Sequence, residues 1–120
     1  GDSTKTIFTG TTGHPVTDGK WIYDGITGTW SYKTFYKFTD TWGYIMIPSL
    51  NEPAWFYFDK NGRMLTGWQW IFWRGSEKCF YFCKTKDSNR GRCQLGGVTP
   101  DGYTVNEDGA WTVNGVMQTR

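Results

Sequence analysis

The sequence predicts an all-β fold of short stacked β-hairpins, a β-solenoid-like arrangement. Of the 120 residues, 8 are Trp, 7 are Tyr and 8 are Phe, while Ala, Leu and Glu, which favour helices, are scarce. Aromatic runs alternate with Gly-containing and Asn-containing turn signals, a pattern typical of successive hairpins. Because a single two-stranded hairpin is only marginally stable in water, we expect the hairpins to bury their faces against one another.

Composition and charge exclude several classes of protein. A net charge of +2 gives no strong electrostatic preference for nucleic acid, and a chain of 120 residues forms one small domain or a short repeat array. No apolar run approaches the roughly 18 residues of a membrane span, so membrane insertion is not expected. The N-terminus has no apolar signal segment, and we expect a soluble chain from which any signal peptide has been removed.

Internal repeats divide the sequence. The stretch 55–68 recurs in weaker form at 79–97, and fainter copies lie at 20–43 and 102–117. We therefore predict an N-terminal extension over residues 1–17 and a repeat module over residues 18–120. The expected repeat units lie approximately at 18–50, 51–74, 75–101 and 102–120.

The first element considered in detail is a hairpin over residues 55–65. A turn centred on Lys60 and Asn61 would pair Phe58 with Arg63, Tyr57 with Met64 and Phe56 with Leu65. Strand alternation would then assign the side chains to two faces, both apolar. The expected faces are Trp55, Tyr57, Met64 and Thr66 on one side, and Phe56, Phe58 and Leu65 on the other.

The next element is the strand-like run 68–73, WQWIFW. Alternation places Trp68, Trp70 and Phe72 on one side and Gln69, Ile71 and Trp73 on the other. Rings in a row along a strand suit stacking against sugar rings. Since so apolar a run cannot be solvated on both sides, at least one side is expected to be buried.

Two segments carry a resemblance to a known family. The order Trp55-Phe56-Tyr57-Phe58, Gly62-Arg63-Met64 and Thr66-Gly67-Trp68 resembles one unit of the choline-binding or cell-wall-binding repeats of Gram-positive surface proteins and phage lysins. Residues 99–111 resemble the end of clostridial repeat arrays. The resemblance covers residues 54–120 well and 18–50 loosely. It implies stacked hairpins whose aromatic cages bind choline on teichoic acids, or glucans and other wall polymers.

The resemblance also implies the ligand-binding residues. Trp55 and Tyr57 match the aromatic pair of the first strand, Met64 the Met that lines the cage, and Trp68 the Trp of the Gly-Trp element. The next unit departs from the pattern, with Cys79 at the Trp position. Together with the weaker copy and the aromatic run, the candidate set is Trp42, Tyr44, Trp55, Tyr57, Met64, Trp68 and Trp70. For each ring the alternative is a purely structural role in the core.

The function implied is a non-catalytic, secreted module that attaches to a polymer of the bacterial surface. A quaternary ammonium gains about 0.5 to 2 kcal/mol per aromatic ring, so one cage binds weakly and several must act together. Two alternatives remain open. One is a carbohydrate-binding module for α-glucan or host polysaccharide that uses Trp68 and Trp70 as a platform, and the other is a structural spacer.

The 3 cysteines cannot all pair. Cys79 and Cys83 on one extended strand would lie about 13 Å apart, beyond the roughly 7 Å that a disulfide spans. A bridge therefore requires Cys93, paired with either Cys79 or Cys83 and expected on the same face as both. With 1 His and no Cys-x-x-Cys pair, no metal site and no cofactor are expected.

Catalytic motifs are absent from the sequence. No H-E-x-x-H or G-x-S-x-G is present, and the Asp and Glu residues lie mainly in turn signals, so we do not expect an enzyme. A basic cluster surrounds the long loop of the third unit, where Glu77 and Asp87 dilute it. We expect this cluster to be a solvated hairpin tip rather than a nucleic-acid site; its members are Lys78, Lys84, Lys86, Arg90 and Arg92.

Overall fold

The structure is a computed structural model that describes residues 14–120, and in this range it consists of antiparallel β-hairpins with no helix. In the described part of the chain, no helix has the length and apolar character that crossing a membrane requires. The predicted all-β class is confirmed. The strands are β1 Lys20–Asp24, β2 Thr29–Lys33, β3 Thr41–Ile47, β4 Glu52–Phe58, β5 Gly67–Trp73, β6 Ser76–Phe82, β7 Thr104–Val105, β8 Trp111–Val113 and β9 Val116–Met117.

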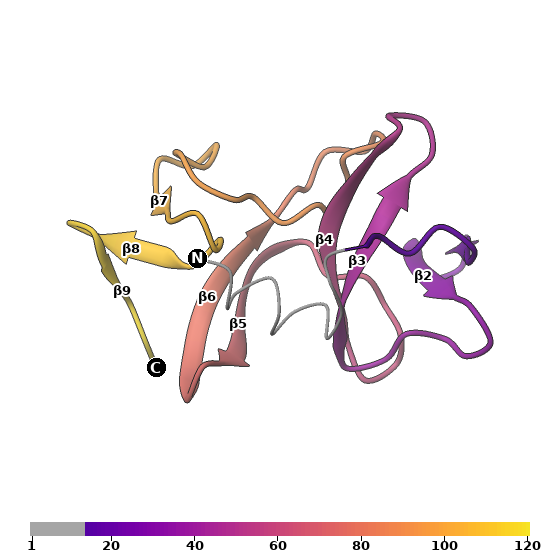
Figure 1. Ribbon diagram of the computed structural model, residues 1–120, viewed down its shortest axis with the longest axis horizontal. Coiled ribbons are helices and arrows are strands. Elements are labelled where there is room, and N and C mark those ends of the chain that lie inside the picture. Colours follow the sequence, from indigo (N-terminus) through magenta and orange to yellow (C-terminus); the bar gives the residue numbers. More distant parts are fainter. Residues whose placement is uncertain (1–13) are drawn as a thin grey trace. The chain divides into compact units, whose positions relative to one another are not determined.

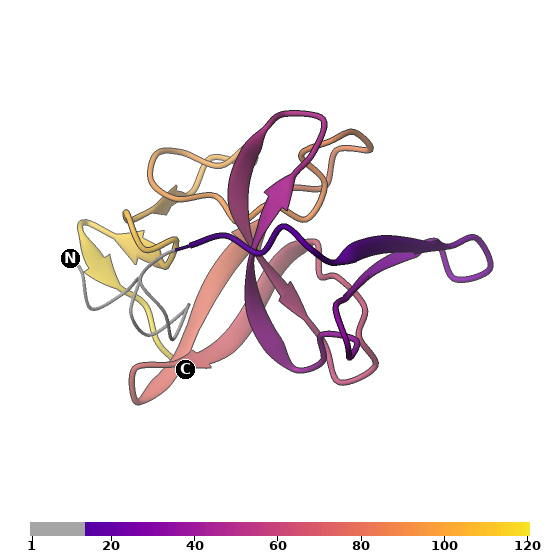
Figure 2. The same ribbon diagram turned by 45° about the vertical axis from the view of Figure 1, so that its right-hand side comes forward.

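The chain forms two compact units that divide between Leu65 and Thr66. The first unit contains the hairpins β1–β2 and β3–β4, and the second contains the hairpin β5–β6 and the three-stranded sheet β7–β8–β9 (Figure 1). Every neighbouring strand pair is antiparallel. The chain is therefore a series of local hairpins, which Figure 2 shows from a second direction.

The core of the first unit lies on one face of β3–β4. The register pairs Gly43 with Phe56 and Ile45 with Ala54, so the buried positions of both strands share a face. Trp21 packs onto this face, with its ring centroid 4.9 Å from that of Phe56. Aromatic rings supply much of the buried apolar area, as the composition suggested. The buried cluster consists of Tyr32, Ile45, Ile47, Ala54, Phe56, Phe58 and Met64.

One residue of the predicted N-terminal extension joins the first unit. Residues 1–13 lie outside the described part of the chain, but Val16 forms a parallel bridge with Ile45 of β3. The Val16 N–H donates to the Tyr44 carbonyl at 2.8 Å, and the Val16 carbonyl accepts from the Met46 N–H at 2.9 Å. This contact covers part of the free edge of β3, which would otherwise expose unpaired backbone groups.

The hairpin predicted around Lys60 and Asn61 had the wrong register. The Asp59 N–H donates to the Arg63 carbonyl at 2.9 Å, which closes a loop of three residues where a two-residue turn was predicted. Gly62 takes the left-handed conformation that such a loop requires, with φ of +80°. The extra loop residue shifts the pairing by one, so Phe58 bridges Met64 and not Arg63.

β4 pairs with β3 along its whole length, and the segment after the turn pairs only with the end of β4, at Phe58↔Met64. The pairs β3–β4 and β5–β6 therefore straddle the predicted unit boundaries at 50/51 and 74/75. The division of residues 18–120 into four repeat units stays a prediction.

In the second unit, β6 bonds along both of its edges. β5 occupies one edge along seven residue pairs from Gly67↔Phe82 to Trp73↔Ser76. Three separate segments bridge the other edge in turn, through Phe82↔Cys93, Phe80↔Ala110 and Lys78↔Thr119. Since an uncovered strand edge is open to aggregation, these bridges protect β6 and bring distant segments together.

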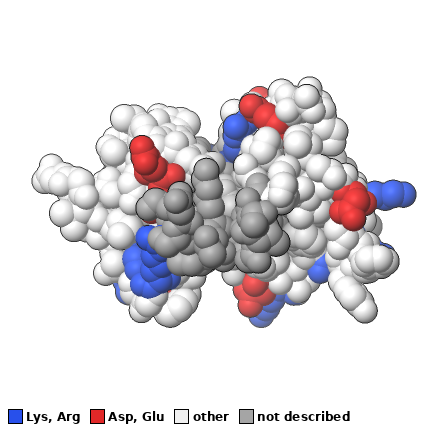
Figure 3. All heavy atoms as spheres, in the orientation of Figure 1, with Lys and Arg blue, Asp and Glu red and all other residues white. Residues whose placement is uncertain are grey.

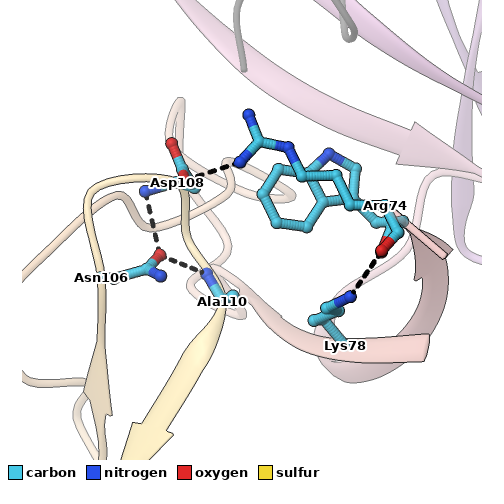
Figure 4. Close-up of polar contacts among 6 residues, drawn as sticks. Arg74, Lys78, Asn106, Asp108 and Ala110 are labelled. Carbon is cyan, nitrogen blue, oxygen red and sulfur yellow. Dashed lines mark hydrogen bonds and ion pairs between the residues drawn. The ribbon is translucent and has the colours of Figure 1, made fainter. Parts of the chain in front are cut away.

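A lysine stabilises the β5–β6 turn from inside. Lys78 is only 5% exposed, and its Nζ donates to the Trp73 carbonyl at 2.9 Å and to Ser76 Oγ at 2.8 Å. It also donates to the Arg74 carbonyl at 3.0 Å, the bond drawn in Figure 4. These three bonds use all three ammonium donors. Lys78 is therefore a structural residue, and its predicted place in a solvated basic cluster was wrong.

The same turn is linked to the C-terminal sheet of the second unit. The Arg74 guanidinium lies over the Trp73 ring at 4.3 Å and reaches Asp108 Oδ2 at 3.9 Å (Figure 4). Asn106 Oδ1 accepts hydrogen bonds from the backbone N–H groups of Asp108 and Ala110, each at 3.0 Å. The side chain of Asn106 thus holds the loop that presents Asp108.

Two Phe residues of the first unit differ in burial, and comparing them tests the core. We expect Phe58→Ala to destabilise the protein by about 3 to 5 kcal/mol, because it opens a cavity in a core where Phe58 is fully buried. Phe35, 90% exposed, is the matched control, and Phe35→Ala is expected to change stability by less than about 0.5 kcal/mol. Urea unfolding followed by circular dichroism measures both; equal effects of the two substitutions would contradict this core.

Candidate functional site

A first group of aromatic side chains lies on the face of β3–β4 that points away from the core. The register pairs Trp42 with Tyr57 and Tyr44 with Trp55. The Trp42 and Tyr57 rings meet edge to face at 5.3 Å, and the Tyr44 and Trp55 rings stack at 4.7 Å. Four of the predicted ligand-binding residues therefore lie together. We call Trp42, Tyr44, Trp55 and Tyr57 the first aromatic group.

The members of this group differ in exposure. Trp55 is buried, at 5% exposed, while the other three are partly exposed. The Tyr57 hydroxyl donates to Asp40 Oδ1 at 3.0 Å. Burial, with a smaller contribution from this hydrogen bond, raises the pKa of Tyr57 to about 12. The ring is thus held in a neutral state and in a fixed orientation.

Met64 does not join the first aromatic group. Because the turn is one residue longer than predicted, Met64 bridges Phe58 and packs in the buried core of the first unit. The Met64 N–H donates to the carbonyl of Trp30 at 2.8 Å, which ties this segment to β2. Its predicted role as a cage-lining residue beside Trp55 and Tyr57 does not match this placement.

A second group of aromatic side chains lies in the second unit. Trp68 contacts Tyr81 of the paired strand with ring centroids 5.2 Å apart, and it meets Tyr103 at 5.9 Å and 89°. Tyr103 meets Trp111 at 6.2 Å and 89°, and Trp111 meets Trp70 at 6.2 Å. All four pairs meet edge to face, at interplanar angles of 61° to 89°. We call Trp68, Trp70, Tyr81, Tyr103 and Trp111 the second aromatic group.

The predicted alternation along 68–73 is confirmed. Ile71 and Trp73 are buried, and Phe72 on the other face is 69% exposed. Trp70, on the same face as Phe72, lies beneath the Arg120 guanidinium at 4.9 Å. Arg120 is in turn paired with Glu77 at 3.0 Å. One face of Trp70 therefore already holds a cation of the chain itself.

A turn carboxylate completes the second aromatic group. The indole N–H of Trp68 donates to Asp101 Oδ2 at 2.8 Å, and the Thr99 hydroxyl donates to Asp101 Oδ1 at 2.6 Å. Asp101 is exposed. The hydrogen bond from Thr99, and to a smaller extent that from Trp68, lowers the pKa of Asp101 below its ordinary value. The backbone N–H of Tyr103 donates to Thr99 Oγ1 at 3.1 Å. One short turn thus positions both Trp68 and Tyr103.

Sequence reasoning missed three members of this group, Tyr81, Tyr103 and Trp111, and it also missed the carboxylate of Asp101 that binds Trp68. Tyr103 and Trp111 lay in the faint terminal repeat, but nothing in the linear sequence showed that this segment returns to Trp68. Tyr81 was recognisable as the cross-strand partner of Trp68 only with the β5–β6 register in hand. Asp101 had the appearance of an ordinary Asp-Gly turn residue.

The cysteines are free thiols in the structure, so the predicted bridge from Cys93 is not formed in it. Cys93 lies opposite Phe82, and alternation therefore places it on the other face of β6 from Cys79 and Cys83. Its expected position on their face was wrong. Burial raises the pKa of both Cys79 and Cys93, whereas Cys83 is partly exposed and contacts Thr85 Oγ1 at 3.0 Å.

The charged side chains of residues 14–120 form no comparable site. Arg90 Nη1 donates to the Lys84 carbonyl at 2.6 Å and Arg92 Nη1 to Asn89 Oδ1 at 3.1 Å, so both arginines brace the long loop. On the face seen in Figure 3, acidic and basic side chains are interspersed. Residues 14–120 contain no group of three or more His, Cys, Asp or Glu placed to hold a metal ion.

Comparison with known proteins shows similarity in structure only. No family model and no curated protein matches the sequence. The modular autolysin LytC from Streptococcus pneumoniae, solved alone and with a synthetic peptidoglycan ligand, is 20% identical over 81% of this chain, with a TM-score of 0.48. A truncated alternansucrase from Leuconostoc mesenteroides is 17% identical over 78%, with a TM-score of 0.36. This chain spans 24% of LytC and 10% of the alternansucrase.

Tyr57 should make stability depend on pH in the alkaline range. Its pKa of about 12 in the folded chain lies above the roughly 10 of an unfolded Tyr, so the folded state holds the proton more tightly. The stabilisation is complete below about pH 10 and is expected to fall as the pH rises towards 12. Urea unfolding at several pH values tests this, and Tyr57→Phe should make the decline shallower; an identical decline in the variant would contradict it.

Thiol reactivity provides a separate test of the cysteine placement. In the native protein we expect Cys83 to react with an aromatic disulfide reagent at least about tenfold faster than Cys79 and Cys93, because burial keeps those two protonated. In denaturant all three should react at similar rates. Three fast thiols before denaturation, or a Cys93 disulfide found by mass spectrometry of the non-reduced protein, would show that the placement is wrong.

Proposed function

We propose that this chain is a non-catalytic binding module of a secreted bacterial surface protein. It attaches to a cell-wall polymer, either teichoic acid decorated with choline or a related wall glycan. The observation that carries the proposal is that the β3–β4 hairpin buries one face in a core and holds Trp42, Tyr44 and Tyr57 partly exposed on the other. The resemblance of residues 54–120 to cell-wall-binding repeats supports the same function, and the likeness to a clostridial array is part of this proposal.

The physical basis of this proposal is that the two faces of the β3–β4 hairpin have different roles. A hairpin needs one apolar face to be stable, and the cluster around Phe56 and Phe58 meets that need. The aromatic rings on the opposite face are not required for that core. Aromatic faces bind quaternary ammonium groups through cation–π attraction and bind sugars by stacking, and both substituents occur on wall polymers.

Affinity would come from the number of sites. One ring group contributes only a few kcal/mol, much of which is offset by the cost of association. Two aromatic groups on one chain can engage a repetitive polymer together, and the second contact is then intramolecular. A polymer with a repeating substituent is therefore a better match than a single small molecule.

A glycan ligand is the second candidate, and one observation favours it. Trp68, Trp70 and Phe72 share a face of β5, and Phe72 is largely exposed. Such a row could stack on α-glucan or a host polysaccharide. Arg120 covers one face of Trp70, which leaves less ring surface for stacking than the sequence suggested.

Retention on isolated walls is the deciding experiment. The full chain would be mixed with purified walls of a choline-containing species, the same walls stripped of teichoic acid, and insoluble starch or dextran. We expect retention on the intact walls alone and elution by millimolar choline. Trp42→Ala and Trp68→Ala should each lower retention by about tenfold or more, because each removes one of two cooperating groups.

Phe35→Ala is the matched control, since Phe35 is an exposed aromatic outside both groups. It should leave retention unchanged. Retention on starch or dextran that choline does not reverse would favour the glycan candidate. If Trp42→Ala and Trp68→Ala lower the folding stability and the wild-type protein is retained on none of the polymers, the result would favour a structural spacer.

A further inference from the structure

Residues 118–120 form a strap across the outer edge of β6. Thr119 bridges Lys78, and the Arg120 backbone N–H donates to the Glu77 carbonyl at 3.1 Å. The strap therefore continues the strand pairing of the second unit. Because these bonds hold its backbone, the point from which the Arg120 side chain extends is fixed.

The Arg120 side chain reaches an aromatic ring and a carboxylate together. Its guanidinium lies 4.9 Å from the centroid of the Trp70 ring, and its Nε donates to Glu77 Oε1 at 3.0 Å. The register of β5–β6 pairs Trp70 with Cys79 and Phe72 with Glu77, so Trp70 and Glu77 belong to one face of the hairpin. Burial raises the pKa of Cys79 and the Arg120 charge opposes this rise, which agrees with a cation above the Trp70–Cys79 pair.

The side-chain contacts of the strap lie at the surface. The Arg120 side chain is 60% exposed and that of Glu77 is 38% exposed. An exposed ion pair contributes little to stability and is screened by salt. The buried side chains of Ile71 and Trp73 belong to the opposite face of β5. The strap can therefore open and uncover Trp70 while the β5–β6 hairpin stays folded.

The strap covers the middle ring of the row on β5. Trp68, Trp70 and Phe72 share a face, and a sugar ring stacks on an indole by van der Waals contact with its face. Arg120 occupies a face of Trp70, and Trp111 contacts the same ring edge to face at 6.2 Å. Phe72 remains 69% exposed. With the strap closed, the row is interrupted at its centre.

We propose that Arg120 determines ligand specificity at this face. The closed strap excludes neutral glycans from Trp70, and the open strap creates a stacking platform formed by Trp70 and Phe72. The inference rests on the proposed attachment to a wall polymer and names the residue that decides between its two ligand classes. Because charged contacts hold the strap closed, salt favours its opening.

The position of the strap can be followed by NMR through the Trp70 indole N–H signal of the ¹⁵N-labelled full chain. Trp70→Phe removes that signal and so identifies it among the 8 tryptophans. Arg120→Gln keeps a polar side chain without the charge and should shift the signal, whereas Arg120→Lys keeps a cation and should shift it less. High salt should move the wild-type signal in the direction of Arg120→Gln.

Specificity is measured with maltoheptaose, a neutral α-glucan, and by affinity electrophoresis in gels that contain soluble starch. We expect no saturation by maltoheptaose and no retardation by starch for the wild type and Arg120→Lys. Arg120→Gln should show a saturable Trp70 shift and bind starch at least about tenfold more tightly than the wild type, as one newly available stacked ring contributes. Glu77→Gln removes the anchor of the guanidinium and should give a smaller increase.

Two controls separate the strap from a general loosening of the fold. The double variant Arg120→Gln with Trp70→Ala should be retarded by starch no more than the wild type, because the uncovered ring is absent. Arg63→Gln removes an exposed guanidinium of the first unit and should leave the mobility in starch gels unchanged.

The outcomes are distinguishable from those of the proposed function. The role of Arg120 is overturned if Arg120→Gln binds starch no better than the wild type, even with a shifted Trp70 signal. It is also overturned if the increase persists in the double variant or appears in Arg63→Gln. Retention on choline-containing walls should be equal in the wild type and Arg120→Gln. Wild-type protein retained on no wall, with starch binding created by Arg120→Gln, would instead contradict the attachment function and leave the strap standing.

Discussion

The alternation of side chains along each pair of strands determines which residues enter the core and which face away from it. A strand presents successive residues to opposite faces, and a pair of strands in register gives each face a consistent character. In β3–β4 one face carries Ile45, Phe56 and Phe58 into a core, and the other carries Trp42 and Tyr57. A shift of one residue would exchange the two sets, so the core and the candidate site depend on the same register.

Turn chemistry sets the register of the segment that follows β4. Asp59 Oδ1 accepts from the backbone N–H groups of Asn61 and Arg63, at 2.8 and 2.9 Å, and Gly62 supplies the positive φ that ends the loop. The loop therefore has three residues. That one extra position moves Met64 from the aromatic face to the core, which shows how a local hydrogen bond decides whether a residue is available to a ligand.

The sequence was sufficient to predict the features that depend on neighbouring residues. The aromatic content and the turn signals indicated hairpins, and alternation correctly separated Trp55 and Tyr57 from Phe56 and Phe58, and Ile71 and Trp73 from Phe72. It was insufficient where the loop length was ambiguous, as at Met64 and Cys93. It also could not show that Lys78 is buried, because its three acceptors belong to the folded turn.

The second aromatic group could not be predicted from local sequence patterns, because its members come from segments that are distant in the sequence. Trp68 and Tyr81 come from one hairpin, but Asp101, Tyr103 and Trp111 arrive because Cys93, Ala110 and Thr119 bridge the outer edge of β6 in turn. Each bridge satisfies backbone groups that would otherwise be unpaired. Closing a strand edge and assembling the aromatic group are therefore the same structural event, and substitutions that loosen the 93–110 segment should affect both.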